Sequence, residues 1–427
     1  MTAGAHDDGT RPPARPGSGG AAPQGRARAL LEVFGAFLRM GCLAFGGPAA
    51  HVGYFHDEFV RRRRWIDDAG FAALLALSQF LPGPSTSQLG FALGMRRYGG
   101  LAGGVAAFLG FTLPPATLMT ALALGAGALR GPLAAGALHG LKLAAVSVVA
   151  HAVLTMARTL APDRTRAAIA LVALAIVTPG GVAAQLMAIG AGLLLGLAFC
   201  RNAAAAGGGA ATPDRAARRR HGLVALALFA ALFAGLPALA ALGDSGPAGE
   251  ALAMANAFYR AGALVFGGGH VVLPLLQTEA AAPAGVAPDV FLTGYALAQA
   301  MPGPMFSFAA WLGALWPRPP DGVAGAAVAI AAIFLPGLLL MYGALPFWSR
   351  LRGDRLASAA VAGANAAVVG VLAAALYRPL WTSAVFTPAD FCVAAAGFLL
   401  LAVWRAPPWA AAAAGAASGL GLALLAG

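Results

Sequence analysis

The sequence is short of charged residues. Only 10% of its 427 residues are Asp, Glu, Lys or Arg, whereas a soluble domain carries about 25%. Apolar residues make up 59%, and the stretches 99–129 and 222–242 contain no charged residue at all. Each stretch is long enough for a helix across a bilayer, which needs about 20 residues. The shortage of charge therefore excludes a soluble globular protein and predicts an all-α polytopic protein embedded in a lipid bilayer.

Cysteine and lysine are also scarce. Cys42, Cys200 and Cys392 lie far apart, without the spacing of metal ligands or of a disulfide framework, so we expect no metal and no cofactor. Lys142 is the only lysine, and the net charge of +12 comes from arginine, which clusters at 61–64 and 215–220 beside apolar runs. Membrane proteins carry such clusters in cytoplasmic loops. We therefore expect no nucleic-acid partner.

One unit is written twice in the chain. "FLRMGCLAFGG" at 37–47 matches "FYRAGALVFGG" at 258–268 with a shift of 221, and "QFLPGP" at 79–84 matches "QAMPGP" at 299–304 with a shift of 220. Separate motifs that stay in register indicate a tandem duplication.

The repeats and the composition between them divide the chain into five parts. We expect a disordered cytoplasmic leader at 1–28, a first transporter repeat at 29–200, an Arg/Ala/Gly-rich cytoplasmic linker at 201–221, an unpaired linking span at 222–242 and a second repeat at 249–427. The single extra span reverses the second repeat. Consistently, the second repeat lacks an Arg cluster where the first has 61–64, which favours inverted repeats with a cytoplasmic N-terminus.

Each repeat carries two predicted helix breaks, at Phe-Gly-Gly and at Pro-Gly-Pro. Proline ends one helix and suits the first turn of the next, so we expect new helices near Pro84 and Pro304, in broken or re-entrant pairs. Matching broken helices in inverted repeats point to a transporter's substrate site, and helix N-termini favour anions. The alternative is that the prolines only kink spanning helices. The candidate binding residues at the breaks are Gly46, Gly47, Pro48, Gln79, Pro82, Gly83, Pro84, Ser85, Gly267, Gly268, Gly269, Gln299, Pro302, Gly303 and Pro304.

Ionisable residues within apolar segments are costly and therefore suggest function. Arg39, Arg260 and Lys142 are further candidates for anion binding, with snorkelling to the membrane surface as the alternative. The candidates for proton coupling are His51, Glu58, His139, His270 and Glu279. The acidic end of the first segment is equally consistent with simple pairing to Arg61 and Arg62. A metal site is not expected, because only His270 and Glu279 remain in the second repeat.

The paired motifs resemble a known family. "FGGPAAHVGYFHDEFVRRRRW" with "QFLPGP", and "FGGGHVVLPLLQTE" with "GYALAQAMPGP", are similar to the chromate ion transporter family, long two-domain type. This resemblance implies a protein of the cytoplasmic (inner) membrane that exports chromate by proton antiport and confers chromate resistance. It also implies sulfate as a competing analogue, and a homodimer is one option for the assembly.

Reasoning from the residues alone reaches a transporter of a small anion and leaves alternatives open. One is a permease for sulfate or another oxyanion. Another, of a different class, is a membrane-embedded hydrolase of a phosphorylated lipid. An enzyme needs a nucleophile next to a base, whereas the polar groups here are spread over both repeats without a Ser-His or Cys-His pairing. We therefore expect a transporter and no enzyme.

Overall fold

A computed structural model describes residues 23–125, 131–179, 181–201, 216–243, 246–266, 269–348 and 353–426. Within these ranges the regular structure is helical, which confirms the all-α prediction. Five helices are long and apolar enough to cross a membrane: Leu101–Gly125, Pro132–Leu160, Arg219–Leu242, Gly322–Phe347 and Arg355–Ala384.

The element order repeats, as the sequence predicts. The first repeat contains α1 (Pro23–Leu43), α2 (Gly47–Phe55), the π-helix η1 (His56–Arg62), α3 (Asp68–Phe80), α4 (Ser85–Tyr98), α5 (Leu101–Gly125), α6 (Pro132–Leu160), α7 (Arg164–Val177) and α8 (Val182–Phe199). Helix α9 (Ala216–Leu242) follows and has no counterpart.

The second repeat runs through the same sequence of elements with shorter pieces. It contains α10 (Pro247–Ala263), η3 (Gly269–Val271), α11 (Val272–Leu276), η4 (Gln277–Ala281), α12 (Ala282–Ala284), α13 (Pro288–Ala300), η5 (Met305–Ser307), α14 (Phe308–Ala314), α15 (Gly322–Ala344), η6 (Leu345–Phe347), α17 (Arg355–Ala375), η7 (Leu376–Trp381), α18 (Thr382–Ala384), α19 (Pro388–Ala402) and α20 (Pro408–Ala426). By order, α10 matches α1, α13 matches α3, α15 matches α5 and α17 matches α6.

Two boundaries differ from the expected ones. Helix α1 begins at Pro23, so the last residues of the expected leader, 23–28, are helical, while 1–22 lie outside the described residues. Helix α9 begins at Ala216, inside the expected linker, of which 202–215 also lie outside. Arginine and alanine are good helix formers, so a polar helical turn extends beyond the apolar run. The expected boundaries marked the apolar run rather than the helix.

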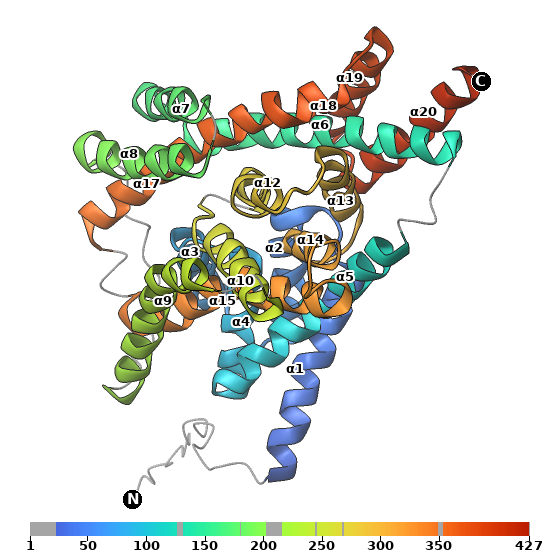
Figure 1. Cartoon of the computed structure of the whole chain (residues 1–427). Helices are drawn as coiled ribbons and strands as arrows, with labels where there is room; N and C mark the ends of the chain where they lie inside the picture. The colour runs from blue at the N-terminus through green and yellow to red at the C-terminus, as the bar shows by residue number, and fades with distance from the viewer. Residues whose placement is uncertain are drawn as a thin grey trace, which may run out of the picture.

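The outer helices of the two repeats are interleaved. Figure 1 shows α7 and α8 beside α17 at one end of the upper layer, and α19 and α20 beside α6 at the other. Glycines permit the close approach: a Cβ on Gly140 of α6 would meet the Gly415 carbonyl of α20, and one on Gly363 of α17 would meet the Gly192 carbonyl of α8. Small residues at such crossings are typical of membrane helices. Each repeat therefore completes the outer layer of the other.

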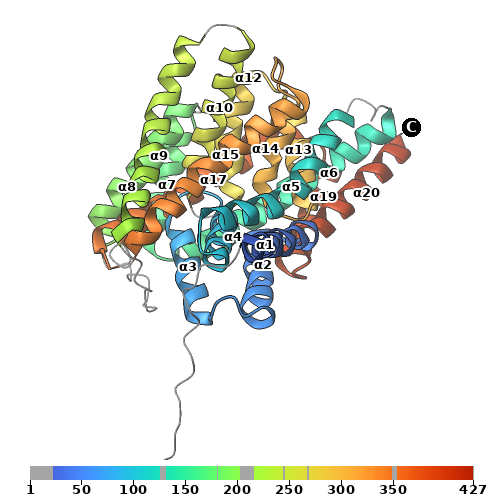
Figure 2. The same cartoon turned by 90° about the horizontal axis from the view of Figure 1, so that it is seen from below.

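The inner layer holds α1, α4 and α5 together with α10, α14 and α15 (Figure 2). Its helix crossings are duplicated too, since a Cβ on Gly41 would meet the Phe111 carbonyl and one on Gly262 would meet the Ile333 carbonyl. Helix α9 packs on α10 and α15, but only 6% of its apolar stretch is buried inside the protein. Its remaining surface therefore suits contact with lipid.

Candidate anion site between the repeats

The predicted helix breaks are present in both repeats. Helix α3 ends at Phe80 and α4 begins at Ser85, with Gly83 at φ 122° between Pro82 and Pro84. Gly303 has φ 85° at the matching place. Such positive φ angles suit glycine because a Cβ would strain the backbone there. After Pro304 the first turn is the 3₁₀-helix η5, and α14 starts at Phe308, slightly later than predicted.

The Phe-Gly-Gly motif of the first repeat also starts a helix. Gly46 is the N-cap at φ 103°, and Pro48 lies in the first turn of α2. In the second repeat η3 starts at Gly269, whereas Gly267 and Gly268 lie outside the described residues.

Backbone hydrogen bonds join the breaks reciprocally across the repeats. The N–H of Gly83 donates to the Val265 carbonyl at 2.7 Å, and the N–H of Gly303 donates to the Ala44 carbonyl at 2.9 Å. Ala44 and Val265 occupy equivalent positions, because the shift between the repeats is 221 residues here. Each Pro-Gly-Pro therefore contacts the Phe-Gly-Gly break of the other repeat, as a pseudo-twofold relation requires.

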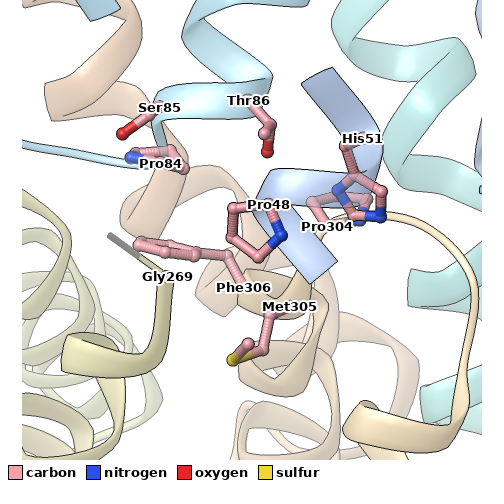
Figure 3. A pocket seen from close by; sticks show the side chains of 9 residues that line it. All are labelled: Pro48, His51, Pro84, Ser85, Thr86, Gly269, Pro304, Met305 and Phe306. Carbon is pink, nitrogen blue, oxygen red and sulfur yellow. The ribbon is translucent and has the colours of Figure 1, made fainter. Parts of the chain in front are cut away.

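A small cavity lies where these breaks meet. It has a volume of about 10 Å³, and Figure 3 shows the side chains around it. Eight of its nine lining residues form four pairs related by the duplication: Pro48 with Gly269, Pro84 with Pro304, Ser85 with Met305, and Thr86 with Phe306. The ninth is His51, whose counterpart, Val272 (51 + 221), does not line the cavity.

The electrostatic character of the cavity comes from backbone and hydroxyl donors. In α4 the backbone hydrogen bonds begin at Gln88, whose N–H donates to the Pro84 carbonyl. The N–H groups of the helical residues before Gln88 therefore have no acceptor within the helix and remain available to a ligand. Ser85 and Thr86 add hydroxyl groups from the same turn. None of the described lining residues is acidic. Together with the partial positive charge of a helix N-terminus, these donors make the cavity suited to an anion.

His51 is the one ionisable residue in the described lining. It is buried, with 1% of its surface exposed, and its Nε2 lies 2.9 Å from the Ala44 carbonyl oxygen. Its ring makes a T-shaped contact with that of Phe111, with 5.4 Å between the ring centroids. Its Nδ1 is buried and has no hydrogen-bond partner. This candidate for proton coupling therefore does reach the cavity.

The two predicted glutamines do not share one role. Gln79 is exposed on α3 and does not line the cavity, whereas Gln299 is buried and its Nε2 lies 3.3 Å from the Met305 sulfur. The two halves thus treat equivalent residues differently.

Arg260 and both predicted glutamates form ion pairs away from the cavity. Arg260 binds Glu279, with 2.9 Å between Nε and Oε2, whereas Glu58 binds Arg62 and Arg63, each at 2.7 Å. Both glutamates lie in π-helical turns, η1 and η4, a rare conformation that is frequent at functional sites. Arg39, the counterpart of Arg260, is exposed near the end of α1.

Three other predicted residues are also engaged elsewhere. Lys142 of α6 binds Asp289 at 2.6 Å in the first turn of α13. His139 lies 2.7 Å from Asp390 of α19. Nδ1 of His270 lies 3.3 Å from the Tyr295 hydroxyl. The structure does not bring any of these three residues to the cavity.

Sequence reasoning missed Thr86, Met305, Phe306 and Gln88. The first three follow directly from the register of the duplication, one or two residues beyond each Pro-Gly-Pro. Gln88 has no such signal. Its Nε2 donates to the carbonyls of Pro82 at 2.9 Å and of Gly337 at 3.0 Å, and so ties the first break to α15 of the second repeat.

Comparison with known proteins agrees with this two-repeat organisation. The family model described as "Chromate transporter" matches twice, at residues 31–197 and 252–420. The chain is 31% identical to a chromate transport protein of Pseudomonas aeruginosa over 88% of this chain and 87% of that protein. It is 30% identical to a probable chromate transport protein of Synechococcus elongatus (82% and 84%) and 29% identical to a chromate transport protein of Cupriavidus metallidurans (81% and 82%). No solved structure matches the chain.

Proposed function

This chain belongs to the chromate transporter family, and on that premise we propose that it exports chromate across the cytoplasmic membrane in a proton-coupled cycle. The N-terminus would lie in the cytoplasm, as the arginine clusters indicate. The relatives compared above are chromate transport proteins by name, which favours transport over the lipid-phosphate hydrolase considered from the sequence.

One observation carries the proposed site: the four helix breaks, two from each repeat, converge on a single cavity that offers hydrogen-bond donors and no acidic side chain among its described lining residues. Chromate is a tetrahedral dianion. Unpaired N–H groups of a helix N-terminus and the hydroxyls of Ser85 and Thr86 donate to anionic oxygens, and hydrogen bonds to charged groups are the strong ones.

The size of the cavity indicates a contracted state. About 10 Å³ accommodates roughly one water molecule, and a tetrahedral oxyanion is larger. Substrate entry therefore requires the repeats to separate at the breaks, where Gly83 and Gly303 donate across the interface. Rocking of inverted repeats around a central site is the usual form of alternating access.

Sulfate is the second candidate substrate, because it shares the shape and charge of chromate and the cavity contacts offer no means to separate them. Uptake of labelled chromate into everted vesicles, with and without an imposed proton gradient and with sulfate as competitor, tests the proposal. We expect saturable uptake that depends on the gradient and is inhibited by sulfate. Uptake equal to that of vesicles without the protein would refute chromate transport. The oligomeric state of the detergent-solubilised protein tests the homodimer.

A further inference from the structure

We propose that His51 takes up a proton when the substrate anion binds, so that a proton accompanies each transported oxyanion. This inference rests on the proposed function, because it takes the cavity between the helix breaks as the oxyanion site. It adds the residue that binds the proton and the sense of the coupling.

The hydrogen bond to Ala44 fixes which ring nitrogen of His51 carries a hydrogen. A backbone carbonyl only accepts hydrogen bonds, so Nε2, at 2.9 Å from that oxygen, is the N–H donor. In the neutral ring, Nδ1 is then an acceptor with a lone pair. Nδ1 is the buried, unpartnered nitrogen of a residue that lines the cavity. Neutral His51 therefore presents an acceptor to a site whose other groups donate.

An oxyanion next to this lone pair meets repulsion between two acceptors. Protonation of Nδ1 removes the conflict, because the imidazolium then donates a charge-assisted hydrogen bond to the anion and partly neutralises it. The converse also holds, since a cationic His51 in this buried cavity lacks an opposite charge until the anion arrives. Proton and anion thus bind with positive cooperativity.

Other titratable groups on the surrounding elements do not take this role. His270 follows the lining residue Gly269 and faces the Tyr295 hydroxyl. Glu58, further along the helix of His51, is held by its arginines. Arg39 of α1 is exposed, and Arg96 and Arg97 lie at the far end of α4. Helices α5 and α14 and the turn η5 contain no ionisable residue.

The same hydrogen bond connects His51 to the interface between repeats. The Ala44 carbonyl accepts from Nε2 of His51 and also from the N–H of Gly303 in the second repeat. The equivalent carbonyl, that of Val265, accepts from Gly83, and its repeat has Val272 in place of the histidine. The proton site therefore lies on one of the two interface bonds that must rearrange for substrate to enter.

This sense of coupling differs from proton antiport, which the family resemblance suggests. An anion and a proton that bind together move in the same direction. A dianion with one proton carries a single net negative charge, so an interior-negative membrane potential favours its export while a proton gradient directed inward opposes it.

Isothermal titration of the purified full-length protein with sulfate tests the proposal. Sulfate is the better probe because chromate itself takes up a proton near neutral pH, whereas sulfate does not. Titrations in buffers of different ionisation enthalpy give the number of protons taken up per anion. In the pH range where His51 is neutral before the anion binds, we expect the uptake of about one proton per bound sulfate. In that range the affinity for sulfate should fall about tenfold per pH unit.

His51→Gln keeps a polar side chain but cannot take up a proton. We expect this variant to bind sulfate with no proton uptake and no pH dependence. His56→Gln is the matched control, because His56 continues the same helix but binds the exposed Asp68 outside the cavity, and it should behave like the wild type.

The outcomes separate the two proposals. Sulfate binding by the wild type without proton uptake overturns the role of His51 and leaves the anion site intact. The same result follows if His51→Gln takes up a proton as the wild type does. If neither sulfate nor chromate binds to the folded protein even at the lowest pH at which it stays folded, where the coupled affinity is highest, the proposed function fails, and this inference fails with it.

Discussion

After Pro84 the first repeat places Ser85 and Thr86 at the cavity, whereas after Pro304 the second repeat places Met305 and Phe306 at the equivalent positions. The backbone is duplicated here: both breaks have a glycine with positive φ, and both donate an N–H to the other repeat. The side chains are not duplicated. The first repeat supplies the hydroxyls and the histidine, and the second supplies an apolar wall.

This difference means that the two repeats offer different chemistry to one cavity. Two equal polar walls would each need partners in the contracted state, and buried polar groups without partners are costly. With Met305 and Phe306 on the opposite wall, only the donors of the first repeat lack partners in the contracted state.

The orientation of the repeats should give an all-or-none result. In a variant without the three native cysteines, Arg61→Cys should react with an impermeant thiol reagent only from the cytoplasmic side, and Ala282→Cys only from the outside. Both positions are exposed, and the single span α9 between the repeats reverses the second one. Reaction of both from one side would contradict inverted repeats.

Replacing Pro82-Gly83-Pro84 by three alanines should abolish oxyanion transport with normal membrane insertion. Helices α3 and α4 would join, and the first-turn N–H groups of α4 would bond within the helix. We expect the same for Pro302-Gly303-Pro304. Vesicle uptake and protein content of the membrane are the measurements, with Pro237→Ala in the unpaired helix α9 as control. Retained transport in both triple variants would show that the breaks serve only as hinges or packing elements and do not bind the anion.

The two walls of the cavity should respond unequally to substitution. Thr86→Val removes a donor, and a hydrogen bond to a charged group contributes about 1.5–3 kcal/mol, so the Kd for sulfate should rise roughly 10- to 150-fold. Phe306→Leu removes only apolar contact and should change Kd by less than about threefold. Equilibrium binding measures both. The opposite ranking would place the anion against the second repeat.

The duplicated glutamates should differ in their effect on stability. Glu279→Gln leaves Arg260 without its partner, and Arg260 is only 17% exposed, so the loss should approach the roughly 3–5 kcal/mol typical of broken buried pairs. Glu58→Gln leaves Arg62, which is 60% exposed, and Arg63, which is 31% exposed and also lies 3.6 Å from Glu32, so its loss should be smaller. Thermal unfolding in detergent ranks them. Arg260→Gln combined with Glu279→Gln should recover part of the loss, and equal melting temperatures for the single variants would remove the distinction.

Lys142→Gln should have the smallest effect. The partner of Lys142, Asp289, is 70% exposed, and exposed ion pairs contribute about 0–1 kcal/mol, so transport should stay within about twofold of the wild type. Loss of vesicle uptake by a stably inserted Lys142→Gln variant would return this lysine to the substrate path.

Helix breaks and the duplication could be predicted because they depend on local chemistry. Proline disrupts a helix, and glycine best tolerates the positive φ of Gly83 and Gly303. Both properties follow from the residue type alone and can be read from the sequence. The same holds for the long apolar spans. The partners of polar groups could not be predicted in this way, because Lys142 and Asp289 are 147 residues apart and many other pairings suit their charges.

Composition, register and the chemistry of proline suffice to specify an all-α membrane protein of two matching repeats, with a helix break at each Pro-Gly-Pro. Three features depend on how the helices pack: Gln79 is exposed while Gln299 is buried, α6 packs on α19 and α20 of the other repeat, and His51 lies at the cavity. The physical reason is that periodicity and backbone preferences act within a few residues. Burial and hydrogen bonding depend on which surfaces meet, and equivalent residues of a duplicated chain therefore meet different neighbours.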